Sequence, residues 1–464
     1  MQHPYLEGVH RPVVGERTDA DLPVIGRIPD ELHGTFARNS GNPRFPPQGR
    51  YHWFDGDGMV HGLHFEAGRA RYTNRWIRTP GLAAEEAAGH ALLRGILEPE
   101  DLRNPLGPVK DTANTDLTWW NGRLLATWWL SGMPQELSVP DLKTVGPVDF
   151  GGLRGAALNE TVTAHPKVDP RTGNLVFFGY NIVKRPYYHY GVAAADGTLL
   201  RYEPMDLPHA HVPHDIAITE RFSILLDLPL GWDKRALASG RRRIGFDRSL
   251  PARFGILPRL GHAADIRWFE AESCYVYHTV VAWEEGDKVQ LIGCRIADPI
   301  PATLPDAPDV ARLDNILLQP LLHLWTFDLA TGAATERCLD DVPSEFPRIN
   351  DQFQGRRARW SWTPRVARQE ALAFDAVRKV DLWTGRAETH TWPEGWLSGE
   401  CVFAPRPGAR DEDDGWLLTI LSNPSLGKSE GVVLDGKEPG GPPLARVALP
   451  WMIPAGFHAE WCPT

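Results

Sequence analysis

Apolar residues in this chain of 464 residues gather in short runs, with glycine, proline and polar residues between them. Each run is rich in β-branched and aromatic side chains and has the length of one strand, whereas a helix needs a longer pattern with a period near 3.6 residues. The clearest runs cover residues 123–129, 174–180, 222–228, 275–283, 322–328 and 416–421. This pattern predicts a chain built mainly from β-strands.

One turn pattern occurs three times between such runs. Residues 169–173, 328–332 and 381–385 each have Asp first, Thr fourth and Gly fifth, which is typical of hairpin turns. The second and third turns are 53 residues apart, and the first and second are 159 apart, three times 53. A period near 50 residues is typical of a four-stranded propeller blade, so the spacing favours a β-propeller of seven blades with insertions.

The segment 81–97 differs from the strand-like runs. It is dense in alanine and leucine around Glu85, Glu86, His90 and Arg94, so it predicts an amphipathic helix inserted into the propeller. Such a helix either packs against the body of the protein or lies on a membrane surface. Packing is the commoner outcome, and we expect it here.

The composition agrees with an all-β fold. Hydrophobic residues make up 42% of the chain and aromatic residues 10%, alongside 44 glycines and 41 prolines. Many aromatic and many turn-forming residues together are typical of short strands joined by turns. No low-complexity tract or long linker divides the sequence. We therefore expect residues 1–464 to form a single domain.

Charge and cysteine usage narrow the possible partners and location. The formal net charge of −10 leaves no extended basic surface for phosphates, residues 241–243, all arginine, being the local exception, so nucleic acid is not expected as a partner. The five cysteines are widely spread and form no CxxC pair, which argues against a disulfide framework or a thiolate zinc site. With no signal-peptide pattern and no membrane-spanning run, a cytoplasmic location is expected. Peripheral membrane contact and the oligomeric state stay open.

Four of the 17 histidines are spaced widely along the chain. His165, His214, His278 and His458 are separated by 49, 64 and 180 residues, so each can lie on a different blade. The innermost strands of a propeller converge on its axis, and the spacing therefore permits a shared metal site. It does not require one, because no short ligand motif such as HExxH is present. His209 and His211 offer further imidazoles, but their place beside prolines favours a structural role.

Several segments of the chain, in this order, resemble the carotenoid cleavage oxygenase family, which also includes retinoid isomerohydrolase and stilbene-cleaving enzymes. The resemblance spans nearly the whole sequence. Its motifs are GTFARN at 34–39, FDGDGM at 54–59, ANT at 113–115, TAHPK at 163–167, HDIAIT at 214–219, RFGILPR at 253–259, AWEE at 282–285 after His278, EFPRIN at 345–350 and GFH at 456–458.

The resemblance implies a seven-bladed β-propeller with helical and loop insertions that form a cap over an axial iron(II) site. The four family ligands match His165, His214, His278 and His458. Nitrogen ligands suit iron(II) and leave a position for dioxygen. The implied reaction is the oxidative cleavage of a conjugated carbon–carbon double bond into two carbonyl products. Beyond the metal centre, no catalytic side chain and no organic cofactor are expected.

The family supports its histidines with carboxylates, and two of three are matched here. Glu345 and Glu400 stand in the corresponding motifs and would hold two of the imidazoles in position. The third glutamate is expected at 129–131, where the chain has Trp129, Leu130 and Ser131. One histidine, which we expect to be His214, would then lack its carboxylate.

Two further positions depart from the family pattern. Val281 replaces an asparagine that the family usually has three residues after the third histidine, and Cys401 replaces a proline that usually follows the last glutamate. Neither position supplies a ligand. The metal site is therefore expected to be intact, with altered surroundings.

The substrate class is less closely constrained. Stilbene-cleaving relatives bind a phenol through a tyrosine and a lysine, and approximate alignment places Trp76 and either Trp128 or Trp129 there. A phenolate needs a charged partner, whereas a polyene needs apolar walls, so these residues favour an apocarotenoid-like substrate. A stilbene or an isoeugenol-like phenylpropene is the alternative. A propeller that binds hydrophobic molecules without turnover is a further, non-enzymatic alternative.

Overall fold

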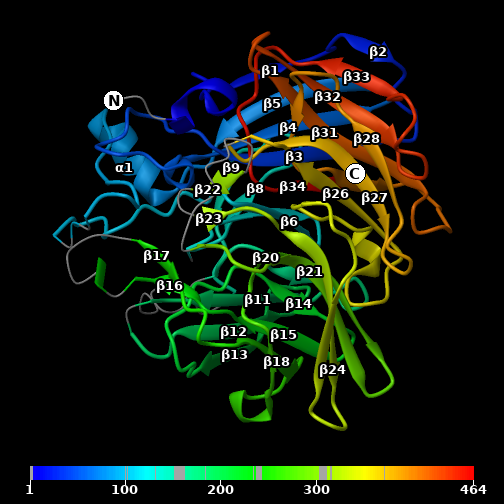
Figure 1. Cartoon of the computed structure of the whole chain (residues 1–464). Coiled ribbons are helices and arrows are strands. Elements are labelled where there is room, and N and C mark those ends of the chain that lie inside the picture. Colours follow the sequence, from blue (N-terminus) through cyan, green and yellow to red (C-terminus); the bar gives the residue numbers. More distant parts are fainter. Residues whose placement is uncertain are drawn as a thin grey trace.

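The computed structural model describes residues 4–99, 101, 103–130, 132–150, 162–182, 184–233, 235–236, 243–301, 311–313, 316–369 and 371–464. Within these residues the chain is mainly β, as the pattern of apolar runs predicts (Figure 1). All the strand pairings within the sheets are antiparallel and mostly join strands that follow one another in the chain. The helical elements whose bounds lie within the described residues include α1 (Pro80–Ala88) and the short 3₁₀ turns Pro4–Leu6, Gly8–His10, Trp53–Asp55, Ala263–Asp265 and Asp351–Phe353.

In the described part of the chain, five sheets have four or five strands each, and two small sheets have two. One is β1 (Arg17–Asp19), β5 (Arg69–Trp76), β4 (Gly58–Glu66), β3 (Gly34–Gly41) and β34 (Ala459–Pro463). The next two are β6 (Asp116–Trp120), β7 (Arg123–Thr127), β8 (Gln135–Leu137) and β9 (Thr144–Pro147), then β10 (Lys167–Val168), β11 (Leu175–Tyr180), β12 (Tyr188–Ala193) and β13 (Leu199–Met205). The others are β14 (Ile216–Ile218), β15 (Phe222–Asp227), β18 (Ala252–Pro258) and β19 (Arg267–Ala271), then β20 (Tyr275–Glu285), β21 (Lys288–Ile296), β24 (Leu321–Asp328) and β25 (Ala334–Cys338). The two-stranded sheets are β16 (Leu230–Trp232) with β17 (Ile244–Phe246), and β22 (Arg312–Leu313) with β23 (Ile316–Leu317).

A larger sheet of nine strands forms the remainder of the described chain. Strand β29 lies between β27 and β31 and joins two groups of strands, each of which has its own hairpins. The members of this sheet are β2 (Val24–Gly26), β33 (Ala445–Ala448), β32 (Lys428–Asp435), β31 (Gly415–Asn423), β30 (Val402–Pro405), β29 (Leu397–Ser398), β28 (Ala387–Thr391), β27 (Phe374–Asp381) and β26 (Trp360–Val366).

The two ends of the chain are joined by strand pairing. Near the C-terminus, β34 pairs with β3, in a register that sets Arg38 opposite Ala459, and the two strands lie side by side in Figure 1. Near the N-terminus, β2 pairs with β33. These pairings bring segments more than 400 residues apart into one sheet. They also place His458 directly before a paired strand, β34, rather than on an unpaired end of the chain.

The predicted strands are confirmed in all six cases. Residues 123–129, 174–180 and 222–228 correspond to β7, β11 and β15, and residues 275–283, 322–328 and 416–421 correspond to β20, β24 and β31. Differences at the ends are small. They arise because pairing with a neighbour, rather than the apolar run itself, decides where a strand ends.

The three repeated turns are hairpin turns, as predicted. In each, the glycine has a positive φ and its N–H donates to the carbonyl of the aspartate, for example Gly332 to Asp328 at 2.8 Å. The period drawn from their spacing is wrong, however. The turns join the first and second strands of one sheet, the third and fourth of another, and β27 to β28 in the nine-stranded sheet. Since they occupy different places in their sheets, 53 residues is not a structural repeat.

Helix α1 is shorter than predicted and packs against the body. It ends where Gly89 adopts a left-handed φ of 77°, a conformation that favours glycine at a helix C-terminus. Leu82 and Glu85 are buried, and Glu85 pairs with Lys110 while accepting from the N–H of Leu92 at 2.9 Å. Within the described part of the chain, no helix is long and apolar enough to cross a bilayer.

We expect Trp325→Ala to lower the free energy of unfolding by about 3–5 kcal/mol, because a large buried side chain would leave a cavity. Trp325 is fully buried in β24, and its ring centroid lies 5.2 Å from that of Phe254. Urea denaturation followed by circular dichroism measures the change. The matched control is Trp383→Ala, since Trp383 is 50% exposed, and it should cost at most about 1 kcal/mol. Equal losses in the two variants would contradict the assigned core.

Candidate metal centre

The structure brings His165, His214, His278 and His458 together as one cluster, here called the histidine quartet. All four side chains are buried. Three of them lie just before a strand: His458 directly precedes β34, and His165 and His214 stand two positions before the first residues of β10 and β14. His278 lies within β20. Four separate sheets therefore contribute one imidazole each.

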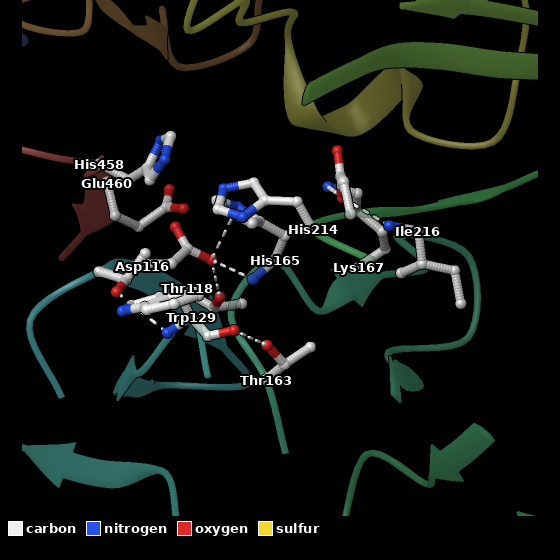
Figure 2. Close-up of polar contacts among 12 residues, drawn as sticks. Asp116, Thr118, Trp129, Thr163, His165, Lys167, His214, Ile216, His458 and Glu460 are labelled. Atoms are coloured by element: carbon white, nitrogen blue, oxygen red, sulfur yellow. Dashed lines mark hydrogen bonds and ion pairs between the residues drawn. The ribbon is translucent and has the colours of Figure 1, made fainter. Parts of the chain in front are cut away.

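The rings of the quartet are closely spaced. The Nε2 atoms of His165 and His214 lie 3.2 Å apart, and Figure 2 shows these two rings together. Ring centroids are 4.9 Å apart for His165 and His278, 4.5 Å for His165 and His458, and 4.6 Å for His278 and His458. The imidazoles thus surround a common space that lies between them.

Irregular backbone conformations set the direction of two of these side chains. His165 has a φ of 66°, in the left-handed region that few residues other than glycine adopt, and its N–H donates to Asp116 at 3.1 Å. The register of β20 against β21 shifts between Val276 and Thr279, the interval that contains His278, and again between Thr279 and Val281, as in a β-bulge. Bulges turn a side chain out of the normal alternation of a strand. Both distortions are typical of residues held in place for a function.

Most of the quartet is held as neutral imidazole. Burial lowers the pKa of His165, His214 and His278 well below the ordinary value, and neighbouring imidazoles and Lys167 lower it further for His165 and His214. Burial also opposes charge on His458, but the Glu400 carboxylate outweighs it and raises the pKa of His458. Neutral imidazole is the form that binds a metal.

Glu345 and Glu400 lie beside the quartet, at the positions that the motifs predict. Glu345 Oε2 lies 2.5 Å from Nδ1 of His278, and Glu400 Oε1 lies 3.3 Å from Nδ1 of His458. Each carboxylate also accepts a backbone N–H, from Phe346 and from Ala459. Burial raises the pKa of Glu345 to about 8. Each glutamate thus contacts the nitrogen of its histidine that faces away from the shared space.

A third carboxylate is present that the motifs did not predict. Asp116 accepts the N–H of His165, and its Oδ2 lies 3.7 Å from Nδ1 of that ring, as Figure 2 shows. It directly follows the ANT motif at 113–115, and that position was the available signal. Sequence reasoning missed it because only the fold brings this strand against His165.

His214 has a different environment. Among the described residues no carboxylate pairs with its ring, and Tyr277 packs against it edge-on at a centroid distance of 5.0 Å. Trp129 and Leu130 lie in an apolar cluster, and Ser131 is outside the described residues. The predicted lack of a glutamate beside His214 agrees with this environment.

The quartet separates two kinds of space. On one side is a cavity of about 300 Å³, here called the polar cavity, which is lined by His165, His278 and His458 together with charged residues including Asp116 and Arg348. On the other side two smaller apolar pockets of about 40 and 60 Å³ share Phe54, Trp129, His214, Tyr277 and Leu313. The linings of the apolar pockets supply candidate substrate-contacting residues, which sequence reasoning left unknown.

The quartet fits a divalent transition metal. Ring nitrogens of His165, His214 and His278 all lie within 4.8 Å of one another. Nε2 of His278 is buried and has no hydrogen-bond partner among the described residues, so a potential ligand nitrogen is left unsatisfied beside the shared space. Four imidazoles without a thiolate suit iron, copper, nickel or zinc better than calcium or magnesium.

Other residues singled out in the sequence lie elsewhere. Nδ1 of His211 pairs with Asp227 at 2.7 Å and His209 stacks on His211, in agreement with a structural role. Val281 and Cys401 are buried in apolar clusters, and burial raises the pKa of the Cys401 thiol to about 12.

Trp76 also lies away from the quartet, and this removes one argument about substrate. It packs with Val13, Met59 and Leu82, and its indole N–H donates to the carbonyl of Asn42 at 2.9 Å. It lines neither apolar pocket, so its identity says nothing about a phenol site. Trp129 lines both apolar pockets, so the argument against a phenolic substrate rests on this residue alone.

Comparisons with known proteins agree with this site. Residues 10–463 match the family described as retinal pigment epithelial membrane protein. The chain is 35% identical to a carotenoid 9,10(9',10')-cleavage dioxygenase of Crocus sativus, over 98% of this chain and 88% of that protein. It is 31% identical to an isoeugenol monooxygenase of Pseudomonas nitroreducens, over 99% and 98%. The solved lignostilbene dioxygenase of Pseudomonas brassicacearum superposes with a TM-score of 0.89 at 29% identity, over 100% and 99%.

These matches cover essentially the whole chain and most of each relative, and they include enzymes named for oxygenase reactions. The histidine motifs, the β architecture and the relatives agree with one another. The chain therefore belongs to the retinal pigment epithelial membrane protein family, the family of the carotenoid cleavage oxygenases, and it is an enzyme of the dioxygenase type.

Proposed function

We propose that this enzyme uses iron(II) and dioxygen to cleave a conjugated carbon–carbon double bond of an apocarotenoid-like substrate. The C=C and O=O bonds break and two C=O bonds form, so alkene and dioxygen account for every atom of the two carbonyl products. The observation that carries the proposal is the buried histidine quartet beside an aromatic pocket. Iron(II), when bound, supplies the activation of dioxygen.

The protein's own residues would bind the metal and position the alkene. His165, His214, His278 and His458 would hold iron(II), with Glu345 and Glu400 fixing the orientation of His278 and His458. Phe54, Trp129 and Tyr277 would hold the substrate against the quartet and exclude water. A dry apolar wall suits a polyene, which offers no polar group to pair.

We also infer that the sheets are blades of one seven-bladed propeller formed by residues 1–464. Five four- or five-stranded sheets plus the two groups within the nine-stranded sheet supply seven blades, and the pairing of β3 with β34 would close the ring. Ile96 and Leu97, which follow α1, line the outer apolar pocket. This supports the prediction that inserted segments cap the metal site.

A stilbene or a phenylpropene such as isoeugenol is the second candidate. The apolar pockets are small, about 40 and 60 Å³, which favours a compact substrate over a long polyene. A phenolate substrate, however, would need a charged partner inside the pocket. Among the described residues that line these pockets, the one cationic side chain is that of Arg243, and it is exposed. Arginines 241 and 242 of the same run lie outside the described residues.

The cytoplasmic location and peripheral membrane contact stay predictions. The prediction that nucleic acid is not a partner rests on the net charge of −10.

Anaerobic reconstitution with iron(II) followed by exposure to air tests the reaction. We expect the loaded enzyme to convert at least one apocarotenal in a panel that also contains stilbenes and phenylpropenes, because its pocket walls are apolar and aromatic. Mass spectrometry of the aldehydes identifies the bond that is cleaved. Turnover of phenolic substrates alone would replace the first candidate by the second. No turnover of any member by iron-loaded protein would refute both.

Substituting His278→Ala should abolish both iron retention and turnover, since it removes one of four ligands. Iron content after gel filtration and the rate of aldehyde formation measure the two effects. The control is His189→Ala, because His189 is buried in β12, stacks on Tyr202 and lies outside the quartet. If the His278 variant kept iron and full activity, that residue would not be a ligand.

The Glu345→Gln variant should bind iron(II) about 10–100-fold more weakly, because an amide holds the imidazole of His278 less well than a carboxylate does. A competition titration against a chelator of known affinity measures the change. Glu412→Gln is the control, since Glu412 accepts backbone N–H groups of Arg359 and Trp360 away from the quartet. Unchanged affinity in the Glu345 variant would exclude its supporting role.

A further inference from the structure

The polar cavity reaches the histidine quartet separately from the apolar pockets, although His278 and His458 also line one of those pockets. It is lined by His165, His278 and His458, whereas His214 lines only the apolar side. At about 300 Å³ it is several times larger than either apolar pocket. A volume of this size with many polar walls holds several water molecules. The quartet is therefore accessible from a wet side and from a dry side.

The polar cavity has an excess of negative charge. Among the described residues, two cations line it, Lys167 and Arg348, against the carboxyl groups of Asp116, Asp215, Asp351, Glu400 and Glu460. Burial raises the pKa of Glu460 to about 8, and without Glu460 four carboxylates still outnumber the two cations. Both cations are already paired: Lys167 lies 2.6 Å from Asp215, and Arg348 lies 3.0 Å from Asp351 and 3.3 Å from Glu460. Clefts with one dominant sign of charge and low-dielectric walls attract ions of the opposite sign.

The carboxylates are arranged from the surface inwards. The side chain of Asp351 is 56% exposed, and beside it Gln352 is exposed as well. Glu460 and Asp116 lie deeper, and Glu400, against His458, is only 3% exposed. In Figure 2 Glu460 and Asp116 lie near His458 and His165. A cation entering from Asp351 would meet negative charge along the whole path.

A buried atom at the inner end also points to a cation. Nε2 of His278, which lines the polar cavity, has no hydrogen-bond partner among the described residues. The apolar pockets offer no comparable path. Their walls are mainly aromatic and aliphatic, and moving a hydrated divalent ion through them would require its dehydration without replacement ligands.

We propose that the polar cavity is the entry route by which a hydrated divalent metal ion reaches the histidine quartet, while the organic substrate enters from the apolar side. The proposal rests on the proposed function only in requiring that the quartet binds a metal. It assigns Asp351 and its neighbours a role in metal loading and not in turnover. Substrate and metal then use separate entrances.

The test changes charge at the mouth of the cavity without breaking an ion pair. Gln352→Lys should slow the association of iron(II) with metal-free protein by about threefold to tenfold at low salt, and Gln352→Glu should accelerate it. Anaerobic mixing followed by chelator quenching measures bound iron against time. High salt should remove most of both effects, because screening weakens the attraction. Iron content at saturation should equal that of the unaltered protein.

Two controls separate the route from a general charge effect. Thr389→Lys and Thr389→Glu make the same charge changes on β28, where Thr389 is exposed and outside the cavity, and should leave the rate unaltered. Arg243→Glu alters the mouth of the outer apolar pocket and should have no effect either.

Two outcomes would overturn the proposal. Equal loading rates in the two Gln352 variants would exclude the polar cavity as the route, and faster loading in the Arg243 variant would favour the apolar side. Both results leave iron binding and turnover untouched, so they are distinguishable from a failure of the proposed function. If the unaltered protein takes up no iron, the proposed function fails and the route fails with it.

Discussion

The pairing of β34 with β3 is the constraint on which the histidine quartet depends. His458 is separated from His165 by 293 residues, and it reaches the quartet because Ala459 is held opposite Arg38 in this strand pair. Backbone hydrogen bonds on both sides fix it further: Asn39 donates to the carbonyl of His458 at 2.9 Å, and the N–H of His458 donates to Thr115 at 3.2 Å. Any loosening of this closure would displace one imidazole from the other three.

The electrostatics of the centre follow from its burial. Four imidazoles in a low-dielectric interior are kept mostly neutral, and carboxylates at Asp116, Glu345 and Glu400 are buried beside them. Burying these carboxylates is costly unless a positive charge and hydrogen bonds compensate them. The backbone N–H groups of His165, Phe346 and Ala459 supply part of that compensation. A divalent cation among the imidazoles would supply the remainder.

The two faces of the quartet differ in a way that suits an oxygenase. Aromatic side chains on one face exclude water from the place where an alkene would lie, while the polar cavity on the other face keeps ionic groups hydrated or paired. His278 and His458 line both the polar cavity and an apolar pocket, while the left-handed φ of His165 and the register shift in β20 around His278 and Thr279 set the direction of two of the rings. Rigid sheets on all sides allow such distortions to persist.

The sequence by itself determined the features that depend on neighbouring residues. The β class, the six strands, the hairpin turns and the motifs around the quartet, Glu345 and Glu400 are local patterns, since alternation, turn chemistry and short motifs act within a few residues. Only the tertiary structure decided which distant segments meet. It placed Asp116 beside His165, moved Trp76 away from the pocket and assigned the three Asp-Thr-Gly turns to different places in their sheets. Such contacts arise from sheet pairing and packing between residues far apart in the chain, and no local pattern encodes the partner that a side chain will find.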